Sequence, residues 1–460
     1  MTTTAETGSL SVEDLDPELY GQIIKPGDAE YDGARALYAG GIDHRPAVII
    51  RPADAAQVSR IVTLARETGL ELSVRSGGHS GVGHSVSDGG ICLDLAAMKA
   101  LDIDVEGRTA WVQTGMTAGE YAAATGEHGL VTGFGDTGTV GVGGITLGGG
   151  VGYLVRKHGL TVDDLLAAEI VTADGKILQV DEDNHPDLFW AIRGGGGNFG
   201  VATRFKFRLH ELAGIHGGFL ILPATPEAIV AFVAEAEAAP EELSTIANIM
   251  PAPPMPFLAE ELHGTPVIFA MICYSGPDED AERVLAPFRA ITPLADMVEP
   301  MPYSGMYPPE EEEMHPIAAS ANMFIDYVDL AVAENIVRRI ESSTALMAAT
   351  QLRVLGGAMA RVPADATAFA HRQSRIMVNL AAIYADPAEA DRHAAWVADF
   401  AASLKQSDDG VYVNFLLDEG EERIRAAYPG GAYERLAEIK AKYDPANLFR
   451  LNQNIPPATG

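Results

Sequence analysis

The first hundred residues alternate between short hydrophobic runs and one amphipathic segment. PAVIIRP (46–52) and ELSVRS (71–76) predict β-strands. The helix expected between them carries apolar side chains on one face: Val58, Ile61, Val62 and Ala65. Strand, helix and strand in this order predict an α/β layer, and such layers bind ligands in loops at the carboxyl ends of their strands. The loop RSGGHS (75–80) follows the second strand and is therefore the first candidate for a ligand site.

A second α/β unit follows, and its connections are rich in glycine. TAWVQTG (109–115) predicts a strand and TAGEYAAATGEHG (117–129) a helix, after which comes GFGDTGTVGVGGITLGGGVG (133–152). DLFWAIRGGGGNFGV (187–201) contains glycines spaced as GxGxxG, but they close a helix and precede a strand. A dinucleotide fingerprint has the opposite order, so a Rossmann nicotinamide site is rejected.

From about residue 213 the pattern changes to longer strands separated by helices. Helices are expected near 226–238, 279–289, 331–345 and 387–404, with strand-like runs between them. The fold class expected is α+β, with an antiparallel sheet covered by helices. The predicted division is 1–212, 213–410 and 411–460. The last segment ends in an asparagine-rich tail that we expect to return to the ligand site, because such a tail needs something to dock against.

Charge and cysteine content narrow the class of protein. The 460 residues include 32 basic and 64 acidic side chains, a net charge of −32, which disfavours nucleic acid and anionic membranes as partners. Two cysteines, Cys92 and Cys273, are too few for a disulfide framework. The polar N-terminal segment has no signal-peptide pattern, and no apolar run reaches about 18 residues. A cytoplasmic protein without a metal site is expected, as a monomer or homodimer.

Glycine supplies the chemistry of the two glycine-rich loops. Without a Cβ, the backbone of 74–83 and 133–152 can bring N–H groups against the phosphates of a large ligand. His79 stands in the middle of the first loop. It is placed to serve as a base, a ligand or a point of covalent attachment, and the alternative is a turn with an incidental histidine.

Six motifs in fixed order resemble the berberine bridge enzyme-like FAD-linked oxidases of the vanillyl-alcohol oxidase superfamily, in particular the bacterial 6-hydroxy-D-nicotine oxidase type. The motifs are RSGGHS (75–80), SDGGICLDL (87–95), TVGVGGITLGGGVGYLVRKHGL (139–160), DLFWAIRGGGGNFGV (187–201), LGGAMARV (355–362) and YDPANLFRLNQNI (443–455). The resemblance implies a two-subdomain FAD-binding domain of the PCMH/VAO type plus the antiparallel-sheet substrate domain.

The resemblance also implies the cofactor contacts. His79 would bond covalently to the 8α carbon of FAD, which raises a flavin's redox potential and prevents its loss. The other contacts it implies are Arg75, Ser76, Gly77, Gly78, Ser80, Thr139, Val140, Gly141, Gly143, Gly144, Gly149, Gly200, Val201, Asn452 and Gln453. Many plant relatives carry a cysteine that makes a second flavin bond; here Thr137 takes that position, so no cysteinyl bond is expected. Val140 resembles the small residue that leaves room for dioxygen, which favours an oxidase.

Candidate catalytic residues lie further along the chain. Tyr412 and Asn414 match a position where relatives present a base or a polar contact, and on a strand they would face the same side. Gln351 and Arg353 have the same spacing on a second strand. Two alternatives stay open: Tyr412 as a core aromatic with a satisfied hydroxyl, and Arg353 as one half of a structural ion pair.

The expected activity is an FAD oxidase that takes a hydride from a C–OH or C–NH carbon of a small molecule to flavin N5 and yields hydrogen peroxide from dioxygen. Sugars and secondary-metabolite alcohols are the leading substrates, with a cyclic amine next. The rival interpretations are a dehydrogenase of the same fold with another acceptor and a flavin-bound scaffold that guides cyclisation without net oxidation.

Overall fold

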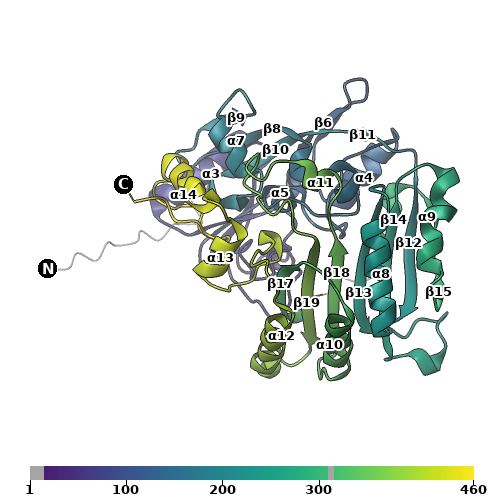
Figure 1. Cartoon of the computed structure of the whole chain (residues 1–460). Coiled ribbons are helices and arrows are strands. Elements are labelled where there is room, and N and C mark those ends of the chain that lie inside the picture. The colour runs from purple at the N-terminus through teal and green to yellow at the C-terminus, as the bar shows by residue number, and fades with distance from the viewer. Residues whose placement is uncertain (1–14, 309–314, 460) are drawn as a thin grey trace.

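The computed structural model describes residues 15–308 and 315–459 (Figure 1). The polar segment 1–12 and the acidic run Glu310–Glu313, which the sequence predicts to be a solvated loop, lie outside these ranges. No helix in the described ranges combines the length and apolar character needed to cross a bilayer.

The N-terminal part contains a four-stranded sheet in the order β1 (Gln22–Ile24), β2 (Val48–Arg51), β4 (Ile91–Asp94), β3 (Leu72–Arg75). β4 pairs in parallel with β2 and β3, while β1 is antiparallel to β2. α3 (Ala55–Thr68) begins after the Asp54 cap and ends at Gly69 in the left-handed conformation. The four side chains predicted to share its buried face are all fully buried. The loop 76–80 leaves β3 at its carboxyl end, as expected.

A five-stranded antiparallel sheet follows in the order β5 (Leu101–Asp104), β6 (Thr109–Gln113), β10 (Val201–Arg208), β8 (Leu165–Val171), β9 (Ile177–Val180). α3 packs against β8–β10 as well as β4, so it lies between the two sheets. The short helices of this part are α1 (Pro17–Tyr20), α2 (Tyr31–Arg35), α4 (Ala118–Gly126), α5 (Val142–Leu147), α6 (Val155–His158) and α7 (Pro186–Ile192). The glycines 194–200 stand between α7 and β10, the order that led us to reject a Rossmann site.

The third sheet is antiparallel throughout. Its strands are β12 (Ile215–Pro223), β13 (Leu243–Pro251), β14 (Pro266–Tyr274), β15 (Ala295–Asp296), β16 (Glu299–Met301), β17 (Ile317–Ile325), β18 (Met347–Val354) and β19 (Ile376–Tyr384), with the main path β15-β12-β14-β13-β18-β19-β17. The helices α8 (Pro226–Ala238), α9 (Ala281–Arg289), α10 (Leu330–Glu341) and α12 (Ala390–Leu404) cover one face (Figure 1). The antiparallel sheet and its helical cover confirm the α+β prediction.

The strand-like run expected from 350 to 362 is shorter than predicted. β18 ends at Val354, because Gly356 and Gly357 take positive φ, and α11 (Ala358–Arg361) follows.

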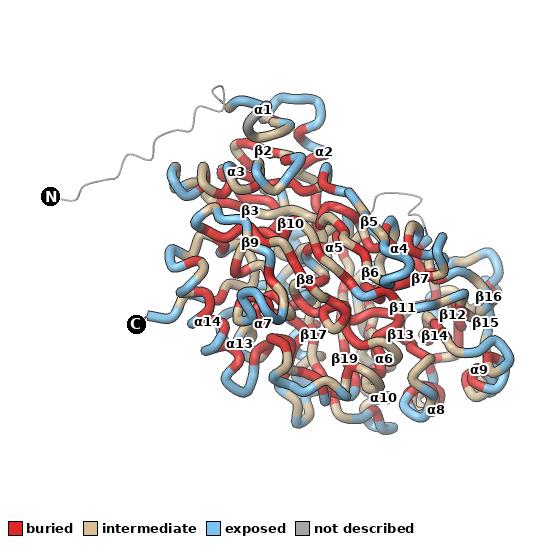
Figure 2. Tube along the Cα trace, turned by 90° about the horizontal axis from the view of Figure 1, so that it is seen from above, coloured by how far each residue is buried: buried red, intermediate tan, exposed pale blue. Residues whose placement is uncertain are grey.

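The other face of the sheet is turned toward the glycine-rich loops. Seen from above, buried residues concentrate along the strands and exposed ones in the outer loops (Figure 2).

The C-terminal segment packs against the N-terminal half. α13 (Glu421–Ala427) and α14 (Ala432–Tyr443) share a hydrophobic core with α7 and β10, and Figures 1 and 2 both show them near α7. Lys440 and Asp444 form a fully buried ion pair at 2.6 Å, and the Lys440 ammonium also donates to the carbonyl of Asn198. The division at 212 and 410 stays a prediction.

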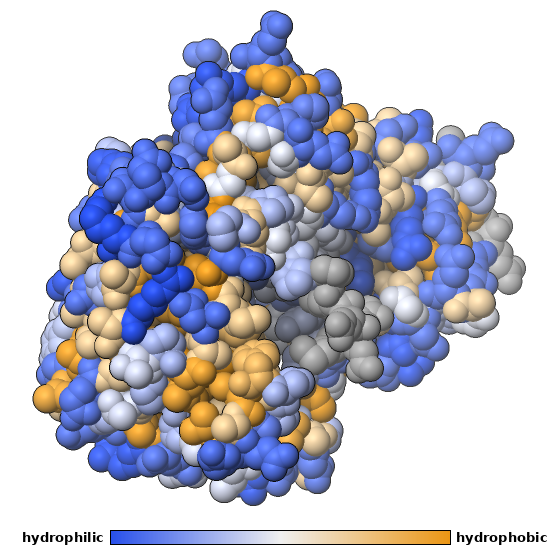
Figure 3. All heavy atoms as spheres, turned by 90° about the vertical axis from the view of Figure 1, so that its right-hand side faces the viewer, coloured by the Kyte–Doolittle hydropathy of each residue, from blue (hydrophilic) through white to orange (hydrophobic). Residues whose placement is uncertain are grey.

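Figure 3 shows one face of the molecule, on which hydrophilic residues cover much of the surface and hydrophobic residues gather mainly at the lower left.

Candidate functional site

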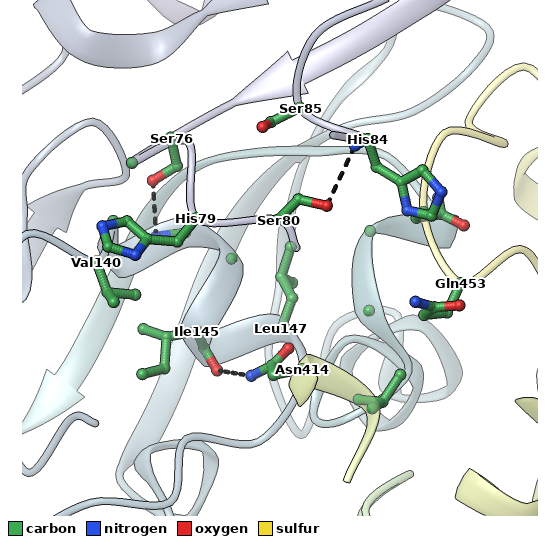
Figure 4. A pocket seen from close by; sticks show the side chains of 18 of the residues that line it. Ser76, His79, Ser80, His84, Ser85, Val140, Ile145, Leu147, Asn414 and Gln453 are labelled. Carbon is green, nitrogen blue, oxygen red and sulfur yellow. Dashed lines mark hydrogen bonds between the residues drawn. The ribbon is translucent and has the colours of Figure 1, made fainter. Parts of the chain in front are cut away.

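One cavity of about 560 Å³ lies where the two glycine-rich loops, the C-terminal segment and the third sheet meet. Most residues predicted from the sequence line it: Ser76, Gly77, Gly78, His79, Ser80, Val140, Gly141, Gly143, Gly144, Gly200, Val201, Gln351, Arg353, Tyr412, Asn414, Asn452 and Gln453. Figure 4 shows His79 and Val140 on one side of this pocket and Gln453 on the other. Segments more than 350 residues apart in the sequence therefore form one site.

Three predicted cofactor contacts do not line the pocket. The Arg75 guanidinium donates to the carbonyl of Ala36 at 2.5 Å and lies 4.0 Å from the Asp94 carboxylate. Thr139 bonds to His79 through its hydroxyl, and Gly149 lies behind the wall, where a Cβ would approach the ring of Phe369 at 2.8 Å. In the structure these residues support the pocket and do not form its surface.

The two glycine-rich loops pack backbone against backbone. A Cβ on Gly141 would lie 2.1 Å from Ser76 Oγ and 2.3 Å from the Gly77 nitrogen. Ser76 fastens the contact, since its hydroxyl donates to the carbonyl of Thr114 and accepts from the amide of Gly143 at 3.2 Å (Figure 4). Glycine is needed at 77 and 141 for this close approach.

Other glycines leave open space in the pocket. A Cβ on Gly144 would meet no atom within 4 Å, and one on Gly197 would meet only the Asn452 amide nitrogen at 4.0 Å. Two buried polar atoms that face the same region, Asn452 Oδ1 and Ser85 Oγ, have no hydrogen-bond partner in the described structure. Bare backbone and unpaired polar atoms together indicate a bound polar molecule, because buried polar groups are otherwise paired.

The imidazole of His79 is held from two directions. Its Nε2 lies 3.0 Å from the Thr139 hydroxyl. The ring of Tyr38 stacks on it, with centroids 4.5 Å apart and an angle of 19° between the planes. His79 is half-buried and lines the cavity, so a ligand reaches its edge.

The strand predicted for Tyr412 and Asn414 is wrong. Residues Val413–Phe415 form a turn of 3₁₀ helix, because the hydrogen bond from Tyr412 N to the Asn322 side-chain oxygen and the bond from Phe415 N to the Tyr412 carbonyl replace sheet pairing. The two side chains still meet, with Asn414 Nδ2 2.8 Å from the Tyr412 hydroxyl.

The Tyr412 hydroxyl is surrounded by donors. It accepts from the amides of Gly150 at 3.0 Å and Val151 at 3.3 Å as well as from Asn414. Burial raises the pKa of Tyr412 above the usual tyrosine value, and these hydrogen bonds and the charge of Arg353 oppose that rise. Tyr412 is only 2% exposed, yet it lines the cavity, so both sequence interpretations, the buried aromatic and the pocket residue, hold in part.

Arg353 forms the ion pair that the sequence left open. Its guanidinium pairs with the Asp136 carboxylate, donates to the Gln351 side chain at 2.8 Å and to the carbonyl of Val151 at 3.2 Å, and lies over the ring of Phe415. Both charged groups line the cavity. The two opposite charges therefore largely cancel each other's electrostatic field at this wall.

A row of four carboxamides crosses the third sheet beside this pair. In the antiparallel register Asn248 stands opposite Gln351, Gln351 opposite Asn379, and Asn379 opposite Asn322. Directly opposed residues share one face of a sheet. Gln351 donates to Asn248 at 3.0 Å, and Gln351 and Asn379 line the cavity. The sheet thus presents hydrogen-bonding side chains to the pocket.

Sequence reasoning missed several residues of the site: Tyr38, His84, Asp136, Asn198 and Asn379. His84 lines the cavity, and burial lowers its pKa. Asn198 is fully buried and ties the tail to the 194–200 loop through the amide of Ile455. Of these five residues only Asn198 could have been predicted from the sequence, by its place within GGGGNFG, because the other four reach the cavity through packing.

The cysteines lie away from the pocket. Cys92 and Cys273 are both free and fully buried, and burial raises the pKa of each to about 12. Thr137, which stands at the position of the plant cysteine, does line the cavity. Within residues 15–308 and 315–459 no group of three His, Cys, Asp or Glu side chains is placed to hold a metal ion.

Comparison with known proteins gives matches over nearly the whole chain. Residues 46–181 match the family described as FAD binding domain, and residues 411–456 match Berberine and berberine like. The uncharacterised FAD-linked oxidoreductase YvdP of Bacillus subtilis (strain 168) is 32% identical over 96% of this chain and 99% of its own length. (R)-6-hydroxynicotine oxidase of Paenarthrobacter nicotinovorans is 30% identical over 95% and 97%. The crystal structure of 6-hydroxy-D-nicotine oxidase from Arthrobacter nicotinovorans superposes with a TM-score of 0.84 at 28% identity, covering 95% and 98% of the two chains.

Proposed function

The chain belongs to the berberine bridge enzyme-like family of FAD-linked oxidoreductases, and on that premise we propose that it is an oxidase of small molecules. It would take a hydride from a carbon that bears a hydroxyl or amine and pass the electrons to dioxygen, giving hydrogen peroxide. The observation that carries the proposal is that the backbone-lined cradle around His79 and the polar wall with Tyr412 and Arg353 belong to one cavity.

The pocket fits FAD. The open positions at Gly144 and Gly197 and the unpaired Asn452 oxygen suit a large polar molecule against bare backbone. When bound, FAD supplies the two-electron acceptor that no side chain provides. We propose that the loop 76–80 and the 139–144 segment hold it, and that His79 makes its single covalent bond. A second, cysteinyl bond is not part of the proposal, because both thiols are buried outside the cavity.

The oxidase assignment rests on Val140. This small side chain lines the cavity next to the His79 loop, and the family resemblance associates a small residue there with room for dioxygen. A relative 30% identical to this chain carries the name oxidase. We therefore propose dioxygen as the electron acceptor.

Tyr412 is proposed as the proton acceptor. Hydride loss from a C–OH or C–NH carbon is eased when a base takes the neighbouring proton. The three donors around the Tyr412 oxygen stabilise its phenolate and hold the oxygen at the pocket wall. Asn414 is a positioning residue in this scheme, since its amide orients the phenol through a 2.8 Å bond and is itself tied to the carbonyl of Ile145 at 3.1 Å.

The polar wall favours a neutral, hydroxyl-bearing substrate. The carboxamides of Gln351 and Asn379 offer both donors and acceptors, so they can form hydrogen bonds with substrate hydroxyl groups. Arg353 already has Asp136 as its counter-ion, so neither of these two charges is free to pair with a carboxylate or an ammonium of a substrate. Sugars, glycosides and secondary-metabolite alcohols are the proposed class, with a cyclic amine second.

The test uses the purified protein and its His79→Ala variant. After acid precipitation, flavin absorbance and fluorescence should stay with the wild-type chain and be released from the variant. The wild-type protein is then screened with alcohols, sugars and cyclic amines for peroxide and oxygen uptake. Flavin reduction under anaerobic conditions without oxygen uptake in air would instead make the protein a dehydrogenase, and a substrate turned over without flavin reduction would make it a non-redox scaffold.

We further propose that the protein acts in the cytoplasm as a monomer or homodimer. Two free, buried thiols support a reducing compartment. Light scattering on the purified protein measures the oligomeric state.

A further inference from the structure

The segment that follows α2 is fastened to the loop that carries His79. The Tyr38 amide donates to the carbonyl of Gly78 at 3.2 Å, and the carbonyl of Ala36 accepts from Arg75 at 2.5 Å. The ring of Tyr38 also stacks on the imidazole of His79. Three contacts within three residues therefore fix residues 36–38 against the RSGGH loop.

The same segment is also hydrogen-bonded to the residues that lead into β17. His315 Nδ1 lies 2.5 Å from the carbonyl of Leu37, and the Gly40 amide donates to the carbonyl of Pro316 at 2.9 Å. A Cβ on Gly40 would lie 2.1 Å from the His315 oxygen, so this contact is as tight as a backbone allows. The chain before and after Tyr38 is thus held by hydrogen bonds, and the Tyr38 ring forms a platform for the imidazole.

The platform and Thr139 restrict the imidazole in different ways. Parallel stacking fixes the plane of the His79 ring, and the 3.0 Å contact of Nε2 with the Thr139 hydroxyl fixes its rotation within that plane. A nucleophile held in one orientation reacts faster, because the entropy of alignment is paid before the reaction.

We propose that Tyr38 is a positioning residue for covalent attachment of the flavin to His79. The inference rests on the attachment in the proposed function. Attachment forms one bond, between an imidazole nitrogen and the flavin 8α carbon, and breaks one N–H and one C–H bond. The two protons and two electrons reduce the flavin, and dioxygen removes them as hydrogen peroxide. Positive charge develops on the imidazole as the bond forms, and the face of the Tyr38 ring stabilises that charge.

The experiment measures two quantities in the purified holoprotein: total flavin from absorbance, and the fraction that stays with the chain after acid precipitation. Tyr38→Ala should retain total flavin, and its covalent fraction after a fixed time with FAD in air should fall about fivefold, the effect of one stacking contact with a developing cation. Tyr38→Phe keeps the ring and should match the wild type. Tyr327→Ala, which removes a half-exposed tyrosine elsewhere, is the matched control.

Three outcomes would each overturn the proposed role of Tyr38. An unchanged covalent fraction in Tyr38→Ala overturns the role of Tyr38 alone. A parallel loss of total and covalent flavin also overturns it, since the residue then serves folding or FAD binding. Release of all flavin from the wild-type chain removes the His79 attachment itself and this inference with it, an outcome seen without any Tyr38 variant.

Discussion

The two walls of the cavity are built from different parts of the chain. The wall around His79 is made of backbone: loops 76–80 and 139–144 touch through Gly77 and Gly141, and a methyl group at either position would collide with the other loop. The opposite wall is made of side chains that stand on β18 and β19, where Gln351, Arg353 and Asn379 project from a regular sheet.

The difference predicts how each wall responds to change. In the proposed function the backbone wall would bind the parts that every FAD molecule shares, and at Gly77 and Gly141 it has no room for a side chain. A side-chain wall changes its chemistry with each substitution while the sheet stays intact. Mutations in the first wall should therefore abolish cofactor binding, and mutations in the second should tune the reaction.

The largest effect is expected for Gly141→Ala. Its methyl group would overlap the Gly77 nitrogen, which belongs to the backbone and cannot rotate away. Overpacking of this kind costs about 3 kcal/mol or more, so we expect a lower unfolding temperature and protein that purifies without flavin. Thermal unfolding and the absorbance near 450 nm measure both.

Gly144→Ala is the matched control for that variant. A Cβ at this position meets no protein atom within 4 Å, and the residue lies in α5, where alanine is favoured over glycine by about 0.5–1 kcal/mol. The protein should keep or gain stability and lose flavin, because the methyl group enters the ligand space. Equal stability losses in the two variants would contradict the backbone wall.

Tyr412→Phe is expected to slow flavin reduction about 100-fold at pH 8, or about 2.7 kcal/mol. In the proposed mechanism the reactive form of Tyr412 is the phenolate, and because burial raises its pKa above 10, the phenolate fraction at pH 8 is below about 1%. Below that pKa the fraction rises tenfold per pH unit, so the wild-type rate should rise with pH from 7 to 9.

The measurement is anaerobic stopped-flow reduction with the substrate found in the peroxide screen. Tyr412→Phe should be flat over the same pH range while its flavin content stays at the wild-type level. A variant that keeps the pH dependence would exclude Tyr412 as the base.

The contrast between the walls also explains what the sequence could predict. A glycine-rich loop leaves a local pattern in the sequence, so RSGGHS and the 139–144 segment, and with them His79 and Val140, were predicted to share a site, and the structure places them in one cavity. The amide row was not, because Asn248, Asn379 and Asn322 meet only through the register of four strands. Tyr412 and Asn414 were found although their strand was wrong, since the 3₁₀ turn also brings residues two apart together.

Arg353→Met should lower the free energy of unfolding by about 2 kcal/mol. Breaking a buried ion pair costs 3–5 kcal/mol, and we take less because the Asp136 side chain is 24% exposed while that of Arg353 is 4% exposed. Asp136→Asn should cost a similar amount. The double variant should lose less stability than the sum of the two single-variant losses, because neither charge is then left without its partner. Urea unfolding of the four proteins measures the coupling, and strictly additive losses would show that the pair contributes no coupling energy.

The smallest effect is expected for Asn379→Ala. This carboxamide lines the cavity beside Gln351, and it has no hydrogen bond within the part of the chain that the structure describes. Removing the carboxamide therefore breaks no hydrogen bond within the described protein, and the only hydrogen bond that can be lost is one to a substrate hydroxyl. One neutral hydrogen bond contributes about 1 kcal/mol, so KM should rise about fivefold while kcat, flavin content and unfolding temperature stay unchanged. Ala381→Ser, two residues along the same face of β19, is the control for an added polar group. A fall in flavin content in Asn379→Ala would place this side chain on the cofactor and would end the division of the cavity into a backbone wall for FAD and a side-chain wall for the substrate.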